Sequence, residues 1–268
     1  IKGTHKKYTG LINEFSSISE TKIKESNYKE GLLDGKLIIW NEGGAKIEES
    51  EFKDGQQIGV KINWNKNGCL IKRAEYKEGL VNGKSVSCNE SGIKIIEGNY
   101  VNNKLHGKSF FWWDNGKQKR ESNFKDGNLN GLSKNWWESG KIKDVLNFQL
   151  GKLEGKFIKY NELGIKLNEC DYIDGEKNGK FITWNEKGNK ISESEVKGDK
   201  RNGISIDWFE NGVKKSECDY KNDLADGKYT QWNESGVKIS EAEFKNNMLN
   251  GTDKEFGKNG FIVKELEF

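Results

Sequence analysis

The sequence is poor in several residue types whose absence excludes whole classes of protein. Its 268 residues include no proline, one methionine, two histidines and four cysteines. Hydrophobic residues make up 33%, which is few for a globular core of this size. No apolar run approaches the roughly 18 residues of a membrane span. With 45 basic and 42 acidic residues, the charge is too balanced to indicate nucleic-acid binding.

One stretch, first seen as "GKLIIWNEGGAKIEESEFKDG", recurs ten times at a fixed spacing of 24 residues. A second glycine follows the opening glycine after nine residues. A large ring follows after five residues, except at Cys88, and another after seventeen, except at Val196. A fixed period without insertions predicts a repeat array. The opening glycines, which define repeats one to ten, are Gly35, Gly59, Gly83, Gly107, Gly131, Gly155, Gly179, Gly203, Gly227 and Gly251.

Each repeat has the pattern of a β-hairpin. A short apolar strand such as "KLIIW" leads into a turn such as "NEGG", and a strand such as "KIEESEF" follows. Asn, Asp and Ser initiate such turns, and the closing glycine supplies a left-handed residue. Glycine, Asn or Asp also occupies the middle of the loop between repeats, where positive φ is tolerated. Helix and disorder fit poorly, because glycines interrupt every repeat and 30 aromatic residues recur in register.

We therefore expect an all-β fold, an elongated repeat array of stacked antiparallel β-hairpins whose rings align in columns inside. Residues 35–268 are expected to form ten 24-residue repeats in one continuous domain. Residues 1–34 are interpreted as a degenerate N-terminal repeat or cap. Glu25, Tyr28 and Gly31 match the later half of the repeat, but "LINEFSSISE" lacks the opening glycine and the ring in its place.

Lysines one residue after many opening glycines are expected to pair with glutamates of the same repeat. Lys36 and Glu49 are one such pair. They face each other if the turn has four residues, and a three-residue turn shifts the pairing by one. Such pairs contribute roughly 0.2–1 kcal/mol each, and register and solubility are their expected role.

The repeated unit "G-K-x-x-x-W-x-E-x-G-x-K-x-x-E-x-x-[FY]-K-D-G" resembles the bacterial variant of the MORN repeat over about residues 11–268. The resemblance implies hairpins stacked in a single twisted sheet or solenoid. It also implies protein–protein interaction or scaffolding, and some bacterial members are labelled antitoxin-like. The repeats at Cys88, Val145 and Val196 depart from the pattern and are expected to pack differently.

Nothing in the sequence indicates catalysis, a cofactor or a metal site. His5 and His106 have no partner at motif spacing, and we expect them to be solvated, with His106 in a loop. The carboxylates recur in every repeat, as on a solvated face, and no His/Cys cluster has metal-ligand spacing. The cysteines Cys69, Cys88, Cys170 and Cys218 form no CxxC pair. Free thiols favour a cytoplasmic location weakly, a Cys69–Cys88 bond stays open, and so does a secreted form whose signal has been removed.

Repeats four and five carry extra rings, in "SFFWWDNG" and "KNWWESG". Phe111, Trp113 and Trp137 replace polar residues, and Val145 replaces the repeated glutamate. The alternation of side chains along a strand places Phe111 on the face of the sheet opposite to that of Trp112. An exposed aromatic patch there would bind a partner; the alternative is that a second apolar layer or a crossing of the chain covers it.

Two functions are compatible with these features. The first is a non-catalytic scaffold that binds a protein at the patch or at the C-terminal edge strand "FIVKELEF", where a second copy of the chain could also pair. The alternative is a glycan or cell-wall-binding module that uses a ladder of tryptophans about 10 Å apart.

Overall fold

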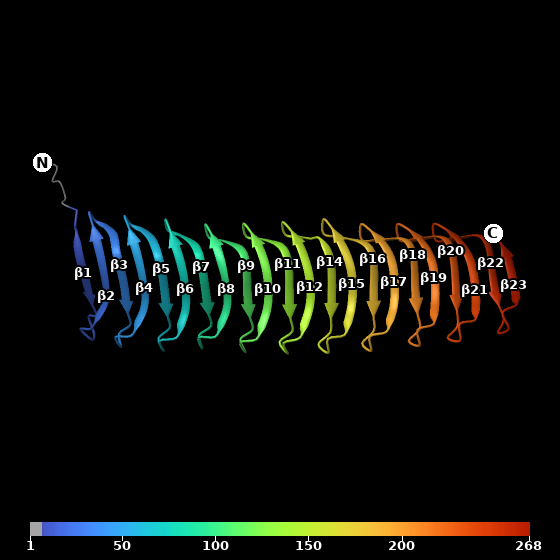
Figure 1. The fold of residues 1–268 in the computed structure, drawn as a ribbon, viewed down its shortest axis with the longest axis horizontal. Coiled ribbons are helices and arrows are strands. Elements are labelled where there is room, and N and C mark those ends of the chain that lie inside the picture. Colours follow the sequence, from blue (N-terminus) through green and yellow to red (C-terminus); the bar gives the residue numbers. More distant parts are fainter. Residues whose placement is uncertain (1–6) are drawn as a thin grey trace. The chain divides into compact units, whose positions relative to one another are not determined.

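The computed structural model describes residues 7–268, so His5 lies outside the described residues. These residues form strands and turns, and no helix occurs among them. The chain divides into two compact units, of which the first ends at Leu129 and the second begins at Asn130. All strand pairs in both units are antiparallel, so the expected all-β fold of stacked hairpins is confirmed (Figure 1).

The first unit contains five hairpins formed by consecutive strands. The strands are β1 (Gly10–Phe15), β2 (Lys22–Lys29), β3 (Leu32–Trp40), β4 (Lys46–Lys53), β5 (Gln56–Trp64), β6 (Leu70–Lys77), β7 (Leu80–Cys88), β8 (Lys94–Val101), β9 (Lys104–Trp112) and β10 (Gln118–Lys125).

The second unit continues the pattern from repeat five to repeat ten. Its strands are β11 (Asn128–Trp136), β12 (Ile142–Gln149), β13 (Lys152–Leu153), β14 (Gly155–Tyr160), β15 (Lys166–Ile173), β16 (Glu176–Trp184), β17 (Lys190–Lys197), β18 (Lys200–Trp208), β19 (Lys214–Lys221), β20 (Leu224–Trp232), β21 (Lys238–Lys245), β22 (Met248–Phe256) and β23 (Ile262–Glu267). In Figure 1 the longer turns within hairpins lie along one edge of each unit, and the short turns between hairpins lie along the other.

The two kinds of turn follow from the residues that the sequence repeats. In the long turn, the Gly44 N–H donates to the Asn41 carbonyl, and the Asn41 side chain accepts the Ala45 N–H at 2.9 Å. Asp54 and Gly55 form the short turn with φ of 48° and 81°, the two left-handed residues that a tight hairpin turn requires. The expected positive φ at the middle of the loop is therefore confirmed.

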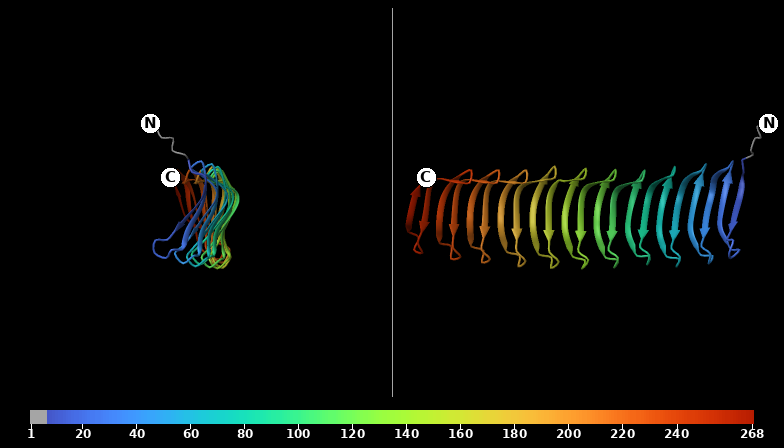
Figure 2. Two further views of the ribbon diagram at one scale, coloured as in Figure 1. Left: turned by 90° about the vertical axis from the view of Figure 1, so that its left-hand side faces the viewer. Right: turned by 180° about the vertical axis from the view of Figure 1, so that it is seen from behind.

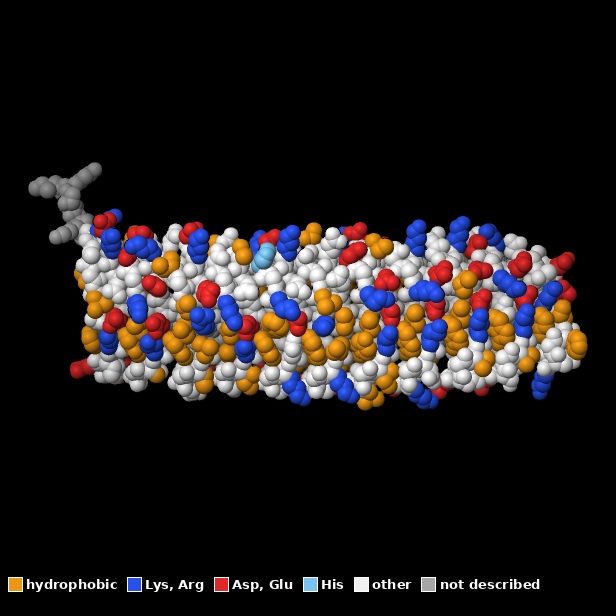
Figure 3. All heavy atoms as spheres, in the orientation of Figure 1, with side chains coloured by type: hydrophobic (Ala, Val, Ile, Leu, Met, Phe, Trp, Pro, Cys, Tyr) orange, Lys and Arg blue, Asp and Glu red, His pale blue; other side chains and the backbone are white. Residues whose placement is uncertain are grey.

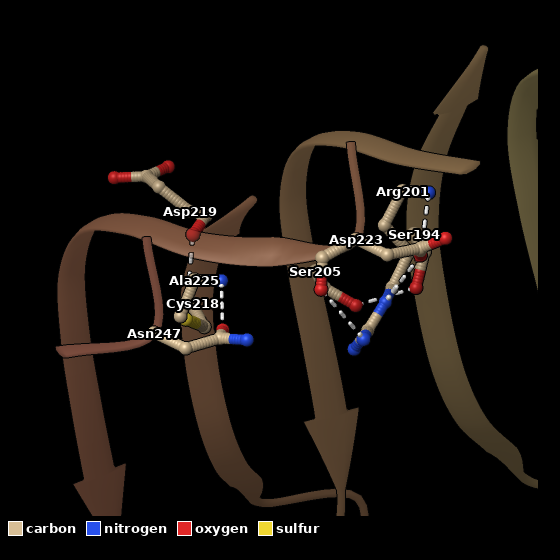
Figure 4. Close-up of polar contacts among 8 residues, drawn as sticks. All are labelled: Ser194, Arg201, Ser205, Cys218, Asp219, Asp223, Ala225 and Asn247. Carbon is tan, nitrogen blue, oxygen red and sulfur yellow. Dashed lines mark hydrogen bonds and ion pairs between the residues drawn. The ribbon is translucent and has the colours of Figure 1, made fainter. Parts of the chain in front are cut away.

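The turn that leaves a repeat also bonds back to the first strand of that repeat. The Asp223 N–H donates to the Arg201 carbonyl at 3.0 Å, and the Asp223 carboxylate accepts the Arg201 N–H at 2.9 Å. Asn247 holds the Ala225 N–H in the same way one repeat later, at 2.6 Å (Figure 4). Arg201 also stacks on Tyr220, 3.7 Å from the ring centroid. Each repeat thereby fixes the position at which the next one starts.

The opening glycine lies close against a side chain of the preceding strand. Gly203 has φ of 126°, and a Cβ there would lie 2.9 Å from the Glu195 Cβ. A side chain at this position would therefore clash as well as strain the backbone.

Small side chains form the most deeply buried column, two residues before the second ring of each repeat. Ser26, Ala74 and Cys170 are essentially inaccessible. The rings themselves are mostly half-buried, so the expectation that they lie inside is met only in part. The reason is that each unit is a single layer. The strands make their extensive contacts with neighbouring strands, and the right-hand view in Figure 2 shows a face that no segment crosses.

The first hairpin corrects one interpretation from the sequence. Gly10 pairs with Tyr28 and Phe15 with Lys22, just as Gly35 pairs with Phe52 and Trp40 with Lys46. The opening glycine and the ring are therefore present. They escaped the pattern because the turn after Phe15 is one residue longer than in the other repeats.

Candidate interaction surface

One face of four hairpins in the described chain carries a cluster of two lysines around one glutamate. In repeat seven, Glu193 lies 2.7 Å from the Lys180 Nζ and 2.9 Å from the Lys190 Nζ. These two lysines hold the pKa of Glu193 below its ordinary value. The register places Ile182 directly opposite Glu193, so the expected lysine–glutamate pairs form diagonally. Equivalent clusters surround Glu97, Glu169 and Glu241.

The second lysine of this cluster also reaches the tryptophan of the next repeat. The Lys190 Nζ lies 4.0 Å from the centroid of the Trp208 ring. A cation at this distance over an indole is attracted by the negative face of the ring. The same contact recurs between Lys22 and Trp40, Lys46 and Trp64, Lys94 and Trp112, Lys166 and Trp184, Lys214 and Trp232, and Lys238 and Phe256.

Repeat five replaces all three members of the cluster with apolar residues. Leu132 and Ile142 occupy the lysine positions, and Val145 occupies the glutamate position. Leu132 is 44% exposed and Ile142 is 38% exposed. Val145 pairs with Lys134 on one side and Ile158 on the other. We call Leu132, Ile142 and Val145 the apolar triad. These residues expose apolar side chains at the positions where repeat seven has a glutamate paired with two lysines.

A groove lies at the long turn of repeat eight in the same unit. It encloses about 500 Å³ and is lined by Trp208, Phe209, Lys215 and the carboxylate-bearing Glu210 and Glu234. Glu210 is bridged to Lys187 at 2.7 Å, which lowers the pKa of this carboxyl group. The groove therefore mixes rings with charges of both signs and does not favour one charged ligand.

Four repeats match the MORN repeat variant, at residues 105–126, 129–149, 201–222 and 225–246. The chain therefore contains MORN repeats. The matched segments correspond to repeats four, five, eight and nine, whose hairpins share the fold described above. No curated protein matches the chain.

Among solved structures, the chain is similar to the crystal structure of TcdB2-TccC3-Cdc42, with 9% identity and a TM-score of 0.22. It is also similar to TcdB2-TccC3 without its hypervariable C-terminal region, with 9% identity and a TM-score of 0.21. The alignments cover 96% and 97% of this chain but 17% of each of those chains. A likeness this weak carries no argument about fold or function.

The extra rings of MORN repeat four lie in the first unit. Phe111 packs against Phe124 with centroids 6.3 Å apart, and Arg120 stacks on Phe111 at 4.0 Å. Trp113 begins the long turn and lies under Lys119, whose Nζ is 4.3 Å from its centroid. Phe110 lies beside Trp112 instead, so the expected alternation of Phe111 and Trp112 is confirmed. Cations of the same repeat partly cover these rings.

The other two predicted patch residues lie in MORN repeat five, in the second unit. Trp137 begins the long turn, donates its indole N–H to the Tyr160 carbonyl at 3.3 Å and lies under Lys143 at 4.5 Å. Val145 lies at mid-strand. The structure therefore places Val145 with Leu132 and Ile142, two residues that the sequence reasoning missed, although each interrupts a column of lysines.

The rings at the start of long turns come with a second replacement. Trp113, Trp137 and Phe209 stand where other repeats have the turn-capping asparagine, apart from Gly257 in repeat ten. In the same repeats, lysine replaces the aliphatic residue six positions later, and each lysine lies over its ring. Asn115 and Asn211 take over the turn by accepting backbone N–H groups.

The remaining chemistry-bearing residues are dispersed. His106 lies in β9 rather than in a loop, exposed and 3.5 Å from Asp126. All four cysteines are free, so no Cys69–Cys88 bond forms. Within residues 7–268, no group of three His, Cys, Asp or Glu side chains is placed to hold a metal ion. The same residues include no helix that could cross a membrane.

Proposed function

We propose that this MORN repeat chain is a non-catalytic scaffold that binds a protein partner through the apolar triad of repeat five. The observation that supports the proposal is the joint replacement of a lysine–glutamate–lysine cluster by Leu132, Val145 and Ile142. Exposed apolar side chains that interrupt a charged face are typical of protein-binding sites. Trp137, at the turn of the same hairpin, adds a ring of the kind that anchors interfaces.

The surroundings of the triad favour an apolar partner surface. Figure 3 shows hydrophobic side chains in a band within each unit, interspersed with lysines and carboxylates. In repeats with the intact cluster, ammonium groups project over this band. Repeat five lacks both of these lysines at the triad, although Lys134 lies directly across from Val145, so a partner would bury hydrocarbon beside one ammonium group instead of a full cluster of charges.

The test converts the triad to the cluster that other repeats already use. The variant Leu132→Lys, Ile142→Lys, Val145→Glu should keep the fold, because repeat seven forms the same hairpin with these residues. Partners captured by the unchanged chain would be identified by mass spectrometry, purified, and titrated against both forms by calorimetry. The expected result is at least a tenfold loss of affinity in the variant. Equal affinity would rule out the triad as the binding site.

The second candidate, a glycan-binding tryptophan ladder, has less support. A sugar ring stacks on an open indole face, whereas most tryptophans of the ladder have one face under a lysine ammonium. Indole fluorescence measured during titration with cell-wall glycans separates the two functions: a shift in emission supports the ladder, and unchanged emission supports the scaffold.

A further inference from the structure

Arg120 in β10 is a cation that the fold holds between rings but does not neutralise. Its guanidinium carbon lies 4.0 Å from the centroid of Phe111 and 5.9 Å from that of Phe124. Its Nε–H is buried without an acceptor among the described residues. Burial lowers the pKa of the guanidinium, and no carboxylate of residues 7–268 offsets this effect. A half-buried charge without a counter-ion costs free energy, so stability alone does not account for an arginine here.

A second buried donor without an acceptor belongs to the same hairpin. The indole Nε1–H of Trp113, at the start of the long turn, has no hydrogen-bond partner within the described part of the chain. In repeat five the corresponding Trp137 donates its indole N–H to the Tyr160 carbonyl. Buried donors in proteins nearly always have an acceptor. Two such donors in one hairpin therefore indicate a ligand that is rich in acceptor oxygens.

The residues beside Arg120 form one row across the strands of the first unit. Residues that pair directly on neighbouring strands lie on the same face of a sheet. Arg120 pairs with Phe111, Phe111 with Ile96, Ile96 with Ser87, and Ser87 with Lys72. The row therefore carries an aromatic and an aliphatic side chain between two cations. Four strand spacings of about 4.8 Å each set the backbone positions of the two cations roughly 19 Å apart.

Lys72, at the other end of this row, also makes no ion pair within the described residues. The nearest carboxylate of the row belongs to Glu48, two strands away, and it already lies 2.8 Å from the Lys61 Nζ. The corresponding row of the second unit places Lys159 directly across from Asp144. The row from Lys72 to Arg120 thus carries positive charge that the first unit itself does not compensate, and it favours an anionic partner.

From these observations we propose that the row from Lys72 to Arg120 binds an acidic segment of a protein partner. One carboxylate of the segment accepts two parallel hydrogen bonds from the planar guanidinium of Arg120, and a second carboxylate lies near Lys72. Apolar side chains between the two acids pack on Ile96 and Phe111. An extended chain rises about 3.3 Å per residue, so roughly five residues separate the two acids. The distance between the cations disfavours a single phosphate, which cannot reach both.

Fluorescence anisotropy with labelled peptides of about seven residues, the length that the span requires, tests the proposal. The unchanged chain should bind peptides that have glutamate at both ends and Leu, Phe or Ala between them. Peptides with glutamine or lysine at the ends should bind at least tenfold more weakly. Arg120→Gln should weaken binding of the glutamate peptides at least tenfold, and Lys72→Gln about threefold. Lys159→Gln, in the corresponding row of the second unit, is the matched control and should bind as the unchanged chain does.

A melting experiment separates binding from a role of Arg120 in folding. Arg120→Met keeps hydrocarbon on Phe111 and removes the uncompensated charge, so the melting temperature should not fall while peptide binding is lost. The absence of peptide binding, equal binding of peptides without glutamate, or a clear fall in the melting temperature of Arg120→Met would each overturn the proposal. So would binding to phosphatidylserine vesicles without binding to the peptides, which indicates a membrane surface. None of these outcomes bears on the apolar triad, whose residues lie in the second unit.

Discussion

Repeats five and seven occupy the same unit and share one hairpin geometry, yet they expose opposite chemistry at the same three positions. In repeat seven, Lys180 and Lys190 bracket Glu193. In repeat five, Leu132, Ile142 and Val145 occupy those positions. Other repeats carry mixed sets at these positions, such as Val60, Leu70 and Arg73 in repeat two. The hairpin therefore tolerates charged, mixed and apolar sets, and the choice among them is free to serve binding.

The largest effect expected from this comparison is a transfer of binding. Converting repeat seven to the triad, by Lys180→Leu, Lys190→Ile and Glu193→Val, should give a chain with two apolar sites. Its stoichiometry toward a partner identified with the unchanged chain should rise from one to two by calorimetry. A stoichiometry of one would show that the triad needs neighbours specific to repeat five.

Single substitutions should be more damaging to stability than the complete sets. Val145→Glu places a carboxylate between Leu132 and Ile142 and should destabilise the fold by about 1–2 kcal/mol. The triple variant with both lysines should regain most of that loss. Urea denaturation of the single and triple variants measures the difference, and additive effects would contradict a cluster that acts as a unit.

Acid should weaken repeat seven more than repeat five. The pKa of Glu193 is lowered, chiefly by the hydrogen bonds from Lys180 and Lys190. Its contribution to stability is therefore complete above the ordinary glutamate value of 4.5, and it is lost as the pH falls through the lower folded value. NMR titration should show Glu193 protonating below pH 4.5, and the repeat-seven triad variant should lose less stability than the unchanged chain between pH 5 and 3.

The smallest expected effect concerns the lysine on the indole. Lys190→Met removes the ammonium over Trp208, a contact that contributes about 0.5–1 kcal/mol at exposed sites, and leaves Glu193 with one lysine. Thermal unfolding should show a decrease of this size. The matched change Ile142→Met in repeat five, where no ammonium is lost, should be close to neutral.

The periodic glycines, rings and turns were sufficient to predict the hairpin, the short-turn backbone and the MORN repeats. The contacts between a lysine of one hairpin and the ring of the next were not predicted. They join residues 18 positions apart, which do not belong to the same turn. The sequence nevertheless carries a signal for these contacts. Leu70 and Ile142 replace the lysine that covers the next ring, and the residues at the ring position one repeat later are Cys88 and Tyr160 instead of tryptophan. Gln118 is an exception, because it also replaces the lysine while the ring 18 residues later is still a tryptophan, Trp136.

The sequence pattern missed the glycine and ring of the first hairpin and two members of the apolar triad, for different physical reasons. One added residue in the turn after Phe15 displaced Gly10 from the 24-residue spacing while leaving the strand pairing intact. The sequence pattern indicates Val145 but not Leu132 and Ile142, because only the diagonal register shows that these two residues lie beside it.

The turn that bonds back to its own repeat, seen at Asp223 and Arg201, has an evolutionary consequence. Since each such turn sets its successor with local atoms alone, unequal recombination can delete or duplicate whole periods and leave the surviving contacts intact. A lineage can thus change how many hairpins it carries by copying, and diversify single copies afterwards without redesigning the rest.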